Sequence, residues 1–548
     1  MKIKLLSLLL ILTNYGFGQQ TVGIFQNDSL AFNGYTLLFP SISKTTWLMD
    51  NCGNIVNEWE SDYNPGLSAY LLENGDLLRT AKISSEFLGG GTGGRIERFN
   101  WDGELIWSYN YSASEYHQHH DIEYLPNGNI LIIAWEKHNY LEALEKGKNP
   151  DLQTSEEFWS ERVVELQPQG SNGGQIVWEW HLWDHLIQDF DNTKANFGTV
   201  AEHPELLDIN KGSIVTDWIH FNSIDYNEEL NQILLSSRNL NEIFIIDHST
   251  TTAQAASHSG GNSGKGGDFL YRWGNPKIYN QGTAANQKLF GQHDAQWIAM
   301  GMEDEGKLMV FNNGIGRPDG NYSTVDIWET PVDEAGNYML NGVYGPTTLS
   351  WTYGNGYSNS FFSGNVSGAQ RLPNGNTLIC EGKFGYLFEV TYDANKVWDY
   401  VSPVVSQGFV TQGNEVVGNN IFRAYRYGAN YPAFDNMELT SGNPLELNPT
   451  NQDCQLFDEI VSSIETSRLL KNVRVINNPI GTQVFIENNT QETVVFEMVD
   501  LTGRIVLQGK GESAFIVENT NQLTKGIYLI RFFNSDKSQF FVAKVVKN

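Results

Sequence analysis

The sequence predicts an all-β protein, a six-bladed β-propeller followed by a small C-terminal β-sandwich. The 548 residues include 53 Gly, 15 Trp, 24 Tyr and 29 Phe, and only 18% are charged, which favours aromatic-rich strands joined by glycine turns. A unit of about 40 to 70 residues, with short strands, recurs about six times between positions 19 and 440, as the blades of a propeller do. A separate pattern of short alternating strands occupies 471–548.

Asparagine–glycine pairs mark turns inside the repeated units, in LLENGDLL, YLPNGNILII and RLPNGNTLIC. Because both central residues of a type I′ turn need positive φ, each pair predicts a two-residue β-hairpin. The closing strand of a unit carries a tryptophan, and we expect Trp107, Trp178, Trp273 and Trp398 to pack between blades. One blade cannot bury both of its faces, so several must form a ring.

The two ends of the chain and one internal segment lack this rhythm. Residues 1–18 combine Lys2 and Lys4 with the apolar run LLSLLLILT and a small-residue stretch, the layout of a secretory signal peptide. No later segment approaches the roughly 20 consecutive apolar residues of a membrane-spanning helix. Residues 441–470 are expected to be a linker. The sequence therefore predicts an exported chain without a transmembrane segment.

Charge and cysteine content limit the partners. A formal net charge of -29 argues against nucleic acid, whose phosphates would be repelled. Cys52, Cys380 and Cys454 lack CxxC or zinc-ligand spacing, so at most one disulfide forms and none is required.

Four residues occupy the same position in four of the repeated units. They are His120 in HDIEYLPNGN, His220 in HFNSIDYNEEL, His293 in HDAQWIAMG and Ser367 in SGAQRLPNGN. The first strand of each blade lines the central channel of a propeller, and each of these residues stands at the start of such a strand. We therefore expect the four side chains to meet at one mouth of the channel.

A cation is expected beside these imidazoles. His220 begins one strand and Arg238 ends the next, so a tight hairpin would return Arg238 to the same end of the blade. Three imidazoles and a guanidinium suit an oxyanion such as sulfate or phosphate.

A metal site is the alternative, because three histidines with Asp121 or Asp294 could bind zinc or copper. Each aspartate directly follows a site histidine, and we expect it to orient an imidazole or to cap a turn. Arg238 would repel a divalent cation, and no HExxH pattern or closely spaced ligand pair is present. We expect no metal here.

The segments HDIEYLPNGNIL, DWIHFNSIDYN followed by SSRN, GQHDA, and SGAQRLPNGNTL resemble the bacterial arylsulfate sulfotransferase family, over roughly Gly34 to Pro432. Members are six-bladed propellers that move a sulfuryl group from one phenol to another. The resemblance implies that His293 is the nucleophile that is transiently sulfated. It implies catalytic support from His120, His220 and Arg238, and substrate contacts from Asn222, to which the repeat register adds Ser367.

The implied reaction has a loose transition state with charge on three peripheral oxygens, as in phosphoryl transfer. Arg238 with His120 or His220 would bind those oxygens, and His220 or His120 would take the proton of the incoming phenol. One covalent intermediate and two half-reactions predict ping-pong kinetics. The donor would be an aryl sulfate ester and the acceptor a phenol, without a cofactor or nucleotide-linked sulfate. The glycine-rich stretches 89–94 and 260–267 lack the Lys-Ser/Thr of a Walker loop and are expected to be surface loops.

The C-terminal module resembles the sorting domain of the type IX secretion system. The resemblance rests on an NP…DxxGR…GxYL…KVV layout that begins at Asn478-Pro479 and includes Asp500 and Gly503-Arg504. It implies that the secretion machinery is a partner, that the chain is exported through the periplasm, and that it is secreted or held at the cell surface.

Two other functions are compatible with the sequence. A non-catalytic surface propeller would bind glycans or proteins and would not turn over an aryl sulfate. A sulfatase would use water in place of the phenolic acceptor.

Overall fold

A computed structural model describes residues 20–152, 154–354, 361–435, 437, 439–450, 454–457, 473–475, 480–488, 493–500, 504–511, 515–533 and 540–547. Contacts divide the chain into two units, Met1–Leu456 and Phe457–Asn548. The expected signal peptide, most of the expected linker after position 450, Asn478-Pro479 and Gly503 lie outside the described residues.

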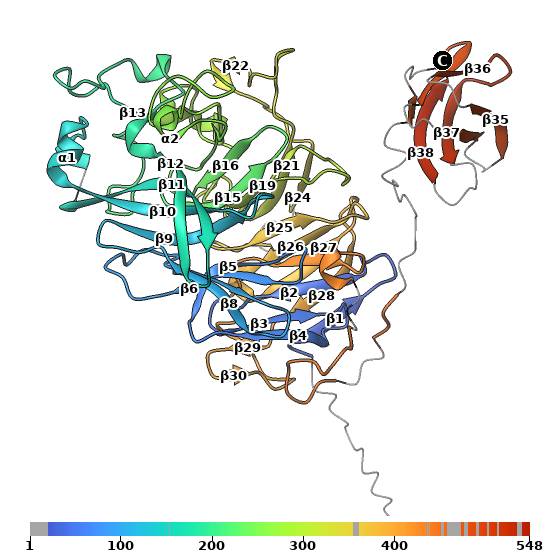
Figure 1. The fold of residues 1–548 in the computed structure, drawn as a ribbon, viewed down its shortest axis with the longest axis horizontal. Coiled ribbons are helices and arrows are strands. Elements are labelled where there is room, and N and C mark those ends of the chain that lie inside the picture. The colour runs from blue at the N-terminus through green and yellow to red at the C-terminus, as the bar shows by residue number, and fades with distance from the viewer. Residues whose placement is uncertain are drawn as a thin grey trace, which may run out of the picture. The chain divides into compact units, whose positions relative to one another are not determined.

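Among its described residues the first unit contains six antiparallel sheets of four or five strands (Figure 1), which agrees with the all-β expectation. Within each sheet the strands are given in the order in which they pair. The first three sheets are β31 (Tyr425–Gly428), β2 (Gly34–Leu38), β3 (Thr45–Met49) and β4 (Ile55–Glu60); β5 (Pro65–Leu71), β6 (Leu77–Lys82), β7 (Gly94–Phe99) and β8 (Leu105–Asn110); and β9 (Tyr116–Tyr124), β10 (Ile130–Asn139), β11 (Glu157–Gln169) and β12 (Gly173–His181). The last three are β15 (Phe221–Asn227), β16 (Gln232–Ser237), β17 (Glu242–Asp247) and β18 (Tyr271–Trp273); β19 (His293–Trp297), β20 (Leu308–Asn312), β21 (Thr324–Trp328) and β24 (Trp351–Tyr353); and β25 (Gly368–Arg371), β26 (Thr377–Glu381), β27 (Tyr386–Val390), β28 (Lys396–Val401) and β1 (Gly23–Asn27).

Short elements connect the sheets. They are two helices, α1 (Tyr140–Glu145) and α2 (Thr252–Ala255); three two-stranded pairs, β13 (Leu186–Ile187) with β14 (Leu207–Asp208), β22 (Leu340–Asn341) with β23 (Val343–Tyr344) and β29 (Val404–Val405) with β30 (Gly408–Phe409); and 3-10 turns at Pro150–Leu152, Leu182–Asp184, Val200–Glu202, Pro276–Tyr279, Ala284–Asn286, Gly382–Phe384 and Pro432–Phe434. In the described part of the chain, no helix has the length and apolar character needed to span a bilayer.

Both ends of the first unit are exchanged between its first and last sheets. β31, from the end of the unit, pairs antiparallel with β2 in the first sheet. β1, from the start of the unit, pairs antiparallel with β28 in the last. Each of these two sheets therefore contains strands from both ends of the chain.

Neighbouring sheets pack face to face through shared apolar clusters. One cluster joins residues of the second and third sheets, including Leu78, Trp107 and Ile132, and another joins the last and the first, including Trp398 and Met49. Four further clusters join the other neighbouring pairs. Burying such faces stabilises the unit by about 25 cal/mol for each Å² of apolar surface removed from water.

The tryptophans of the closing strands do more than fill these interfaces. In every sheet an indole N–H donates a hydrogen bond to an oxygen of the next sheet or its flanking loop, and the last sheet bonds to the first. These bonds are Trp59 to Asn100 O (2.9 Å), Trp107 to Gly173 O (2.9 Å), Trp178 to Thr250 Oγ1 (3.2 Å), Trp273 to Pro346 O (3.0 Å), Trp351 to Tyr392 O (2.8 Å) and Trp398 to Asn51 O (2.7 Å).

The asparagine–glycine turns differ from the expected type I′ geometry. Gly75, Gly128 and Gly375 have φ of 84 to 87°, but the preceding asparagines are not in the positive-φ region. In the first turn Gly75 N donates to Leu72 O (2.9 Å) and Leu72 N to Asp76 O (2.8 Å), which is a three-residue loop with a left-handed glycine. The prediction of two-residue turns was wrong because only the glycine needs positive φ in this loop.

The second unit contains two antiparallel sheets. One holds β32 (Val473–Val475), β33 (Gln483–Asn488) and β36 (Phe515–Asn519), and the other β35 (Ile505–Gly511), β34 (Val494–Val499), β37 (Gly526–Phe533) and β38 (Phe540–Lys547). Side chains of both sheets, among them Ile486, Phe496 and Ile530, share one core.

The segment after β31 is held against the first unit. Cys454 forms a disulfide with Cys52, in the turn between β3 and β4, and Cys380 is a buried free thiol. Gly442 N donates to Ile55 O (2.8 Å) and Ser441 Oγ to Asp50 Oδ2 (2.7 Å). The described part of the expected linker is therefore bound to the first sheet up to the disulfide.

Replacing Cys52 and Cys454 with serine should lower the stability of the first unit, because the disulfide closes a loop of 402 residues. Loop closure of this kind contributes about 2 to 4 kcal/mol. Thermal unfolding of the oxidised chain, the reduced chain and the double variant checks this. Reduction should lower the Tm of the parent to that of the variant, and a Tm unaffected by reduction would contradict the assignment.

Candidate active site

We call the edge strands β5, β9, β15, β19, β25 and β31 the inner strands of their sheets. The three histidines that the sequence singles out stand where inner strands begin or bulge. His120 (φ 49°) and His220 (φ 58°) adopt the left-handed region, which is rare for a residue with a side chain. The pairing register shifts beside each, in β9 against β10 and in β15 against β16, and shifts again after His293 in β19. Such bulges redirect a side chain out of the strand's regular alternation.

The structure brings His120, His220, His293 and Arg238 together, as the register predicts. The His120 and His220 rings lie 4.6 Å apart between centroids, and Phe422 lies 5.9 Å from His120 and 6.1 Å from His293. Arg238 N donates to His220 O (3.1 Å), so the hairpin returns Arg238 to this end of the sheet. His120 and His293 are each 3% exposed, and His220 and Arg238 are partly exposed. We call these four residues the histidine cluster.

The surroundings of His293 fix which nitrogen is free. Its Nδ1 lies 2.7 Å from Asn313 Oδ1 and 3.1 Å from Gly291 O, both acceptors, so Nδ1 carries the hydrogen. The Asn313 amide is fixed because its Nδ2 donates to Ser363 O (2.6 Å) and Val366 O (2.9 Å). Burial lowers the pKa of His293 to about 3, and the charge of Arg238 adds to this. His293 is therefore neutral at pH 7, with the lone pair on Nε2.

His220 has a carboxylate partner. Its Nδ1 lies 2.5 Å from Asp217 Oδ2, and Trp135 Nε1 donates to the other oxygen of Asp217 at 3.2 Å. Burial raises the pKa of Asp217, but its bonds with His220 outweigh this and the net pKa is lowered. Asp217 Oδ2 therefore accepts the Nδ1 hydrogen of His220.

His120 ends a chain of buried groups. Glu161 Oε2 lies 2.9 Å from His119 Nε2, and His119 Nδ1 lies 2.9 Å from His120 Nδ1. Burial raises the pKa of Glu161 well above its usual value, and burial lowers that of His120 well below. With Glu161 protonated, each group in the chain donates to the next, and Nε2 of His120 carries a hydrogen.

The glycine-rich stretch 89–94, expected to be a surface loop, packs directly on the histidine cluster. Gly91 O accepts the backbone N–H of His120 (2.7 Å), and Gly91 has φ of 79°. A Cβ at Gly91 would lie 2.1 Å from the His120 ring, and one at Gly90 would lie 3.6 Å from His220. The loop therefore needs glycine in order to cover the imidazoles.

Asn222 and Ser367 are both fully buried. Asn222 Nδ2 donates to the carbonyl of Gln292 (2.7 Å), the residue before His293, and its Oδ1 has no partner within the described residues. The Ser367 hydroxyl donates to Ser363 Oγ (2.9 Å) and accepts from Gly382 N (3.0 Å). The Ser367 hydroxyl is therefore already engaged by these two hydrogen bonds.

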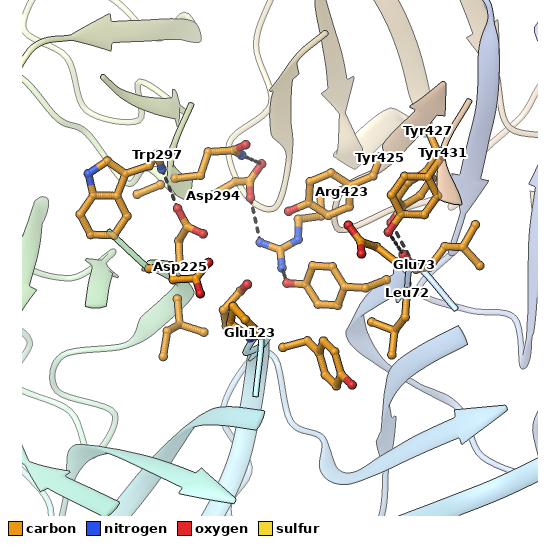
Figure 2. A pocket seen from close by; sticks show the side chains of 18 of the residues that line it. Leu72, Glu73, Glu123, Asp225, Asp294, Trp297, Arg423, Tyr425, Tyr427 and Tyr431 are labelled. Carbon is orange, nitrogen blue, oxygen red and sulfur yellow. Dashed lines mark hydrogen bonds and ion pairs between the residues drawn. The ribbon is translucent and has the colours of Figure 1, made fainter. Parts of the chain in front are cut away.

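Asp121 and Asp294, expected to orient an imidazole or cap a turn, bind Arg423 instead. Arg423 Nη1 donates to Asp294 Oδ1 (2.8 Å; Figure 2), and Nη2 contacts both Asp121 Oδ1 and the Tyr70 hydroxyl. All three charged groups are buried. The free oxygens of the two carboxylates accept Ile224 N (3.1 Å) and Ala369 N (3.0 Å), which ties four inner strands to one guanidinium.

A second group of possible metal ligands lies outside the histidine cluster. Asp268 Oδ1 is 2.8 Å from Nδ1 of both His185 and His258, and the three ligand atoms lie within 4.8 Å of one another. His185 Nε2 is 2.8 Å from Ala255 O, so both ring nitrogens of this buried histidine face acceptors. Both imidazoles are therefore explained as hydrogen-bond partners of one carboxylate, that of Asp268.

Sequence reasoning did not identify the partners that tune the imidazoles. Asp217 stands three residues before His220, and His119 directly precedes His120, so both were visible as neighbours. Asn313 and Glu161 come from other strands and carry no sequence signal. Arg423 lies at the end of the unit in IFRAYRYG, outside the recurring register.

A family model of arylsulfotransferase (ASST) matches residues 21–420, and a model of the secretion system C-terminal sorting domain matches residues 475–548. No curated protein matches the chain.

Solved structures that are similar to the chain have low scores. A protein of unknown function from Bacteroides caccae is 12% identical over 68% of this chain and 95% of its own (TM-score 0.38). The periplasmic gluconolactonase of Pseudomonas aeruginosa is 12% identical over 72% and 99% (TM-score 0.36). The Cps50 β-propeller domain of Myceliophteria thermophila is 10% identical over 70% and 86% (TM-score 0.34). Similarity at this level carries no argument about function.

Replacing Arg423 with glutamine should destabilise the first unit by about 3 to 5 kcal/mol, because it leaves two buried carboxylates without their cation. Urea unfolding checks this, with Arg98→Gln as the control. Arg98 pairs with Asp76 at 2.6 Å but is partly exposed, and its loss should cost under about 1 kcal/mol. Equal effects of the two substitutions would show that Arg423 is not a structural centre.

Proposed function

The chain belongs to the arylsulfotransferase family, and we propose that it is an exported enzyme that moves a sulfuryl group from an aryl sulfate ester to another phenol. The C-terminal sorting domain marks the chain for export, to the cell surface or the medium. We place the reaction at the histidine cluster, on a six-bladed β-propeller followed by a small β-sandwich.

The observation that carries the proposal is the buried His293, whose Nδ1 bonds to Asn313 and whose Nε2 has no hydrogen-bond partner within the described residues. In the first half-reaction the Nε2 lone pair attacks sulfur, an N–S bond forms, and the bond from sulfur to the aryl oxygen breaks. The leaving phenolate takes a proton. In the second, the acceptor phenol gives up its proton, its oxygen attacks sulfur, and the N–S electron pair returns to Nε2. The Nδ1 hydrogen stays bonded to Asn313 throughout.

We assign the proton transfers to His220. Its carboxylate partner Asp217 supports the imidazolium that must protonate the leaving oxygen and later accept the proton of the incoming phenol. The phenols involved have a pKa of about 10, so protonation of the leaving oxygen matters most for unactivated donors.

We assign His120 and Arg238 to the sulfuryl oxygens. Burial keeps His120 neutral, and the chain from Glu161 through His119 provides Nε2 of His120 as a donor. Arg238 supplies the fixed positive charge for an anionic group. The amide oxygen of Asn222, which has no partner within the described residues, is an acceptor that a phenolic hydroxyl could use. The bonds of Ser367 support a structural role for its hydroxyl at the site.

Incubation with 4-nitrophenyl sulfate without acceptor should leave a sulfuryl group on His293. Intact-protein and peptide mass spectrometry under non-acidic handling would locate it. His293→Gln should abolish the adduct and reduce transfer to phenol by at least about 10³-fold, because the nucleophile is lost. The control is His203→Gln, at a partly exposed histidine paired with Glu205. Full transfer activity in His293→Gln would rule out the covalent mechanism.

Asp217→Asn should slow transfer from phenyl sulfate by about 10²-fold, since it removes support for the His220 imidazolium. The loss should be much smaller with 4-nitrophenyl sulfate, whose leaving group needs little protonation. The matched comparison is His120→Gln, which should slow both donors alike because both carry the same sulfuryl oxygens. Equal losses for the two donors in Asp217→Asn would contradict the assignment of His220 as the acid.

A further inference from the structure

A cavity of about 790 Å³ opens beside Arg423 (Figure 2), and the residues that line it in β9, β15 and β19 follow the histidines of the cluster along the chain. Its lining comes from β5, β9, β15, β19 and β31 and from the turns that follow them. Aromatic rings and carboxylates dominate that lining: Tyr70, Tyr425, Tyr427, Tyr431 and Trp297 with Glu73, Glu123, Asp225 and Glu228. We call it the tyrosine cavity. Its volume is that of a small-molecule site.

The aromatic wall of the tyrosine cavity is held in place by hydrogen bonds and ring contacts. The Tyr427 hydroxyl accepts Leu71 N (3.0 Å), and the Tyr431 hydroxyl donates to Leu71 O (2.8 Å). The Tyr70 and Tyr425 rings stack at 5.6 Å between centroids. The wall is therefore formed before any ligand arrives, which reduces the entropy lost on binding.

Two carboxylates in the tyrosine cavity lack a cation. Glu123 lies near the end of β9 and Asp225 near the end of β15, and both line the same part of the cavity (Figure 2). Asp225 Oδ2 accepts Trp297 N (2.6 Å), and the Glu123 carboxylate has no hydrogen-bond partner within the described residues. Burial raises the pKa of Asp225 to about 7, and burial together with the charge of Asp225 raises that of Glu123 well above its usual value.

The charge of Arg423 lowers the pKa of Glu123, but burial and the neighbouring carboxylates outweigh it. Arg423 is the one basic side chain among the described residues that line the tyrosine cavity, and Asp121 and Asp294 already engage it. An anionic ligand such as an aryl sulfate would meet the uncompensated carboxylates. A cation with an apolar body would neutralise them and pack on the aromatic faces, which attract cations.

We propose that the tyrosine cavity binds an organic ammonium ion, with the charged nitrogen between Glu123 and Asp225 and the apolar body against the tyrosines. The inference does not depend on sulfuryl transfer, because the residues of the histidine cluster do not line the tyrosine cavity.

Isothermal titration calorimetry of the full chain with benzylammonium chloride tests the proposal. Benzyl alcohol, a neutral molecule of the same shape, is the ligand control, and sodium chloride controls for ionic strength. Benzylammonium should bind and benzyl alcohol should not. Glu123→Gln and Asp225→Asn should each weaken binding by about ten-fold or more, because each removes half of the charge that holds the nitrogen. Glu334→Gln, at an exposed carboxylate outside the cavity, should bind like the parent.

A stability measurement shows that the variants are folded and that the carboxyls are buried. A carboxyl whose pKa is raised on folding destabilises the folded state once the pH exceeds its ordinary value. Glu123→Gln should therefore raise the Tm at about pH 8 and leave it nearly unchanged at about pH 4, where the parent carboxyl is protonated in both states. Benzylammonium affinity of the parent should rise as the pH increases through about 7.

Three results would overturn the proposal. They are the absence of binding heat at about 10 mM benzylammonium, equal affinity for benzyl alcohol, and folded Glu123→Gln and Asp225→Asn variants that bind like the parent. None of them bears on His293 sulfation, so failure here is distinguishable from failure of the proposed enzyme.

Discussion

The ion pairs of Arg423 with Asp121 and Asp294 are the contact on which the site depends most. Each aspartate directly follows a histidine of the cluster, so the position of the guanidinium sets the backbone that presents His120 and His293. Three charges are buried there together, an arrangement that is stable only when each is paired and its remaining oxygens accept hydrogen bonds. Backbone amides of β15 and β25 supply those bonds.

The three histidines of the cluster differ in their hydrogen bonding because each has a different partner on Nδ1. Burial keeps His293 neutral and Asn313 Oδ1 fixes its hydrogen on Nδ1, Asp217 accepts the Nδ1 hydrogen of His220, and another imidazole bonds to His120. The partner of Nδ1 therefore determines whether Nε2 of the same ring carries a hydrogen or a lone pair. In the proposed reaction this division separates the nucleophile, the proton carrier and the donor to the sulfuryl group without any change of residue type.

Much of this arrangement could be predicted because the chain repeats one unit, so residues at the same position in different units are expected to lie close together in space. The shared register of His120, His220 and His293 was enough to expect a cluster, and the hairpin after His220 was enough to add Arg238. The closing tryptophans were expected between sheets, and they are buried there. Partners that come from single, unrepeated positions could not be found this way. Arg423 and Asn313 belong to no register, and the pairing of Cys52 with Cys454 joins residues at the two ends of the first unit.

Other misses have local physical causes. Asn-Gly favours a type I′ turn in isolation, but a three-residue loop satisfies the same strand ends with only the glycine in the left-handed region. The glycine-rich stretch 89–94 is partly exposed, as a surface loop is expected to be, but the need for glycine at Gly91 arises from the His120 ring beneath it. Composition alone does not reveal what lies beneath a loop.

The exchange of β1 and β31 between the first and last sheets has a consequence for biogenesis. The first sheet lacks one of its strands until residues 425–428 have left the ribosome, and the last sheet must recruit residues 23–27 from the opposite end of the chain. Long-range pairing of this kind is slow and cannot begin on a partial chain. A polypeptide built this way completes the sheets of its first unit only after synthesis has passed residue 428.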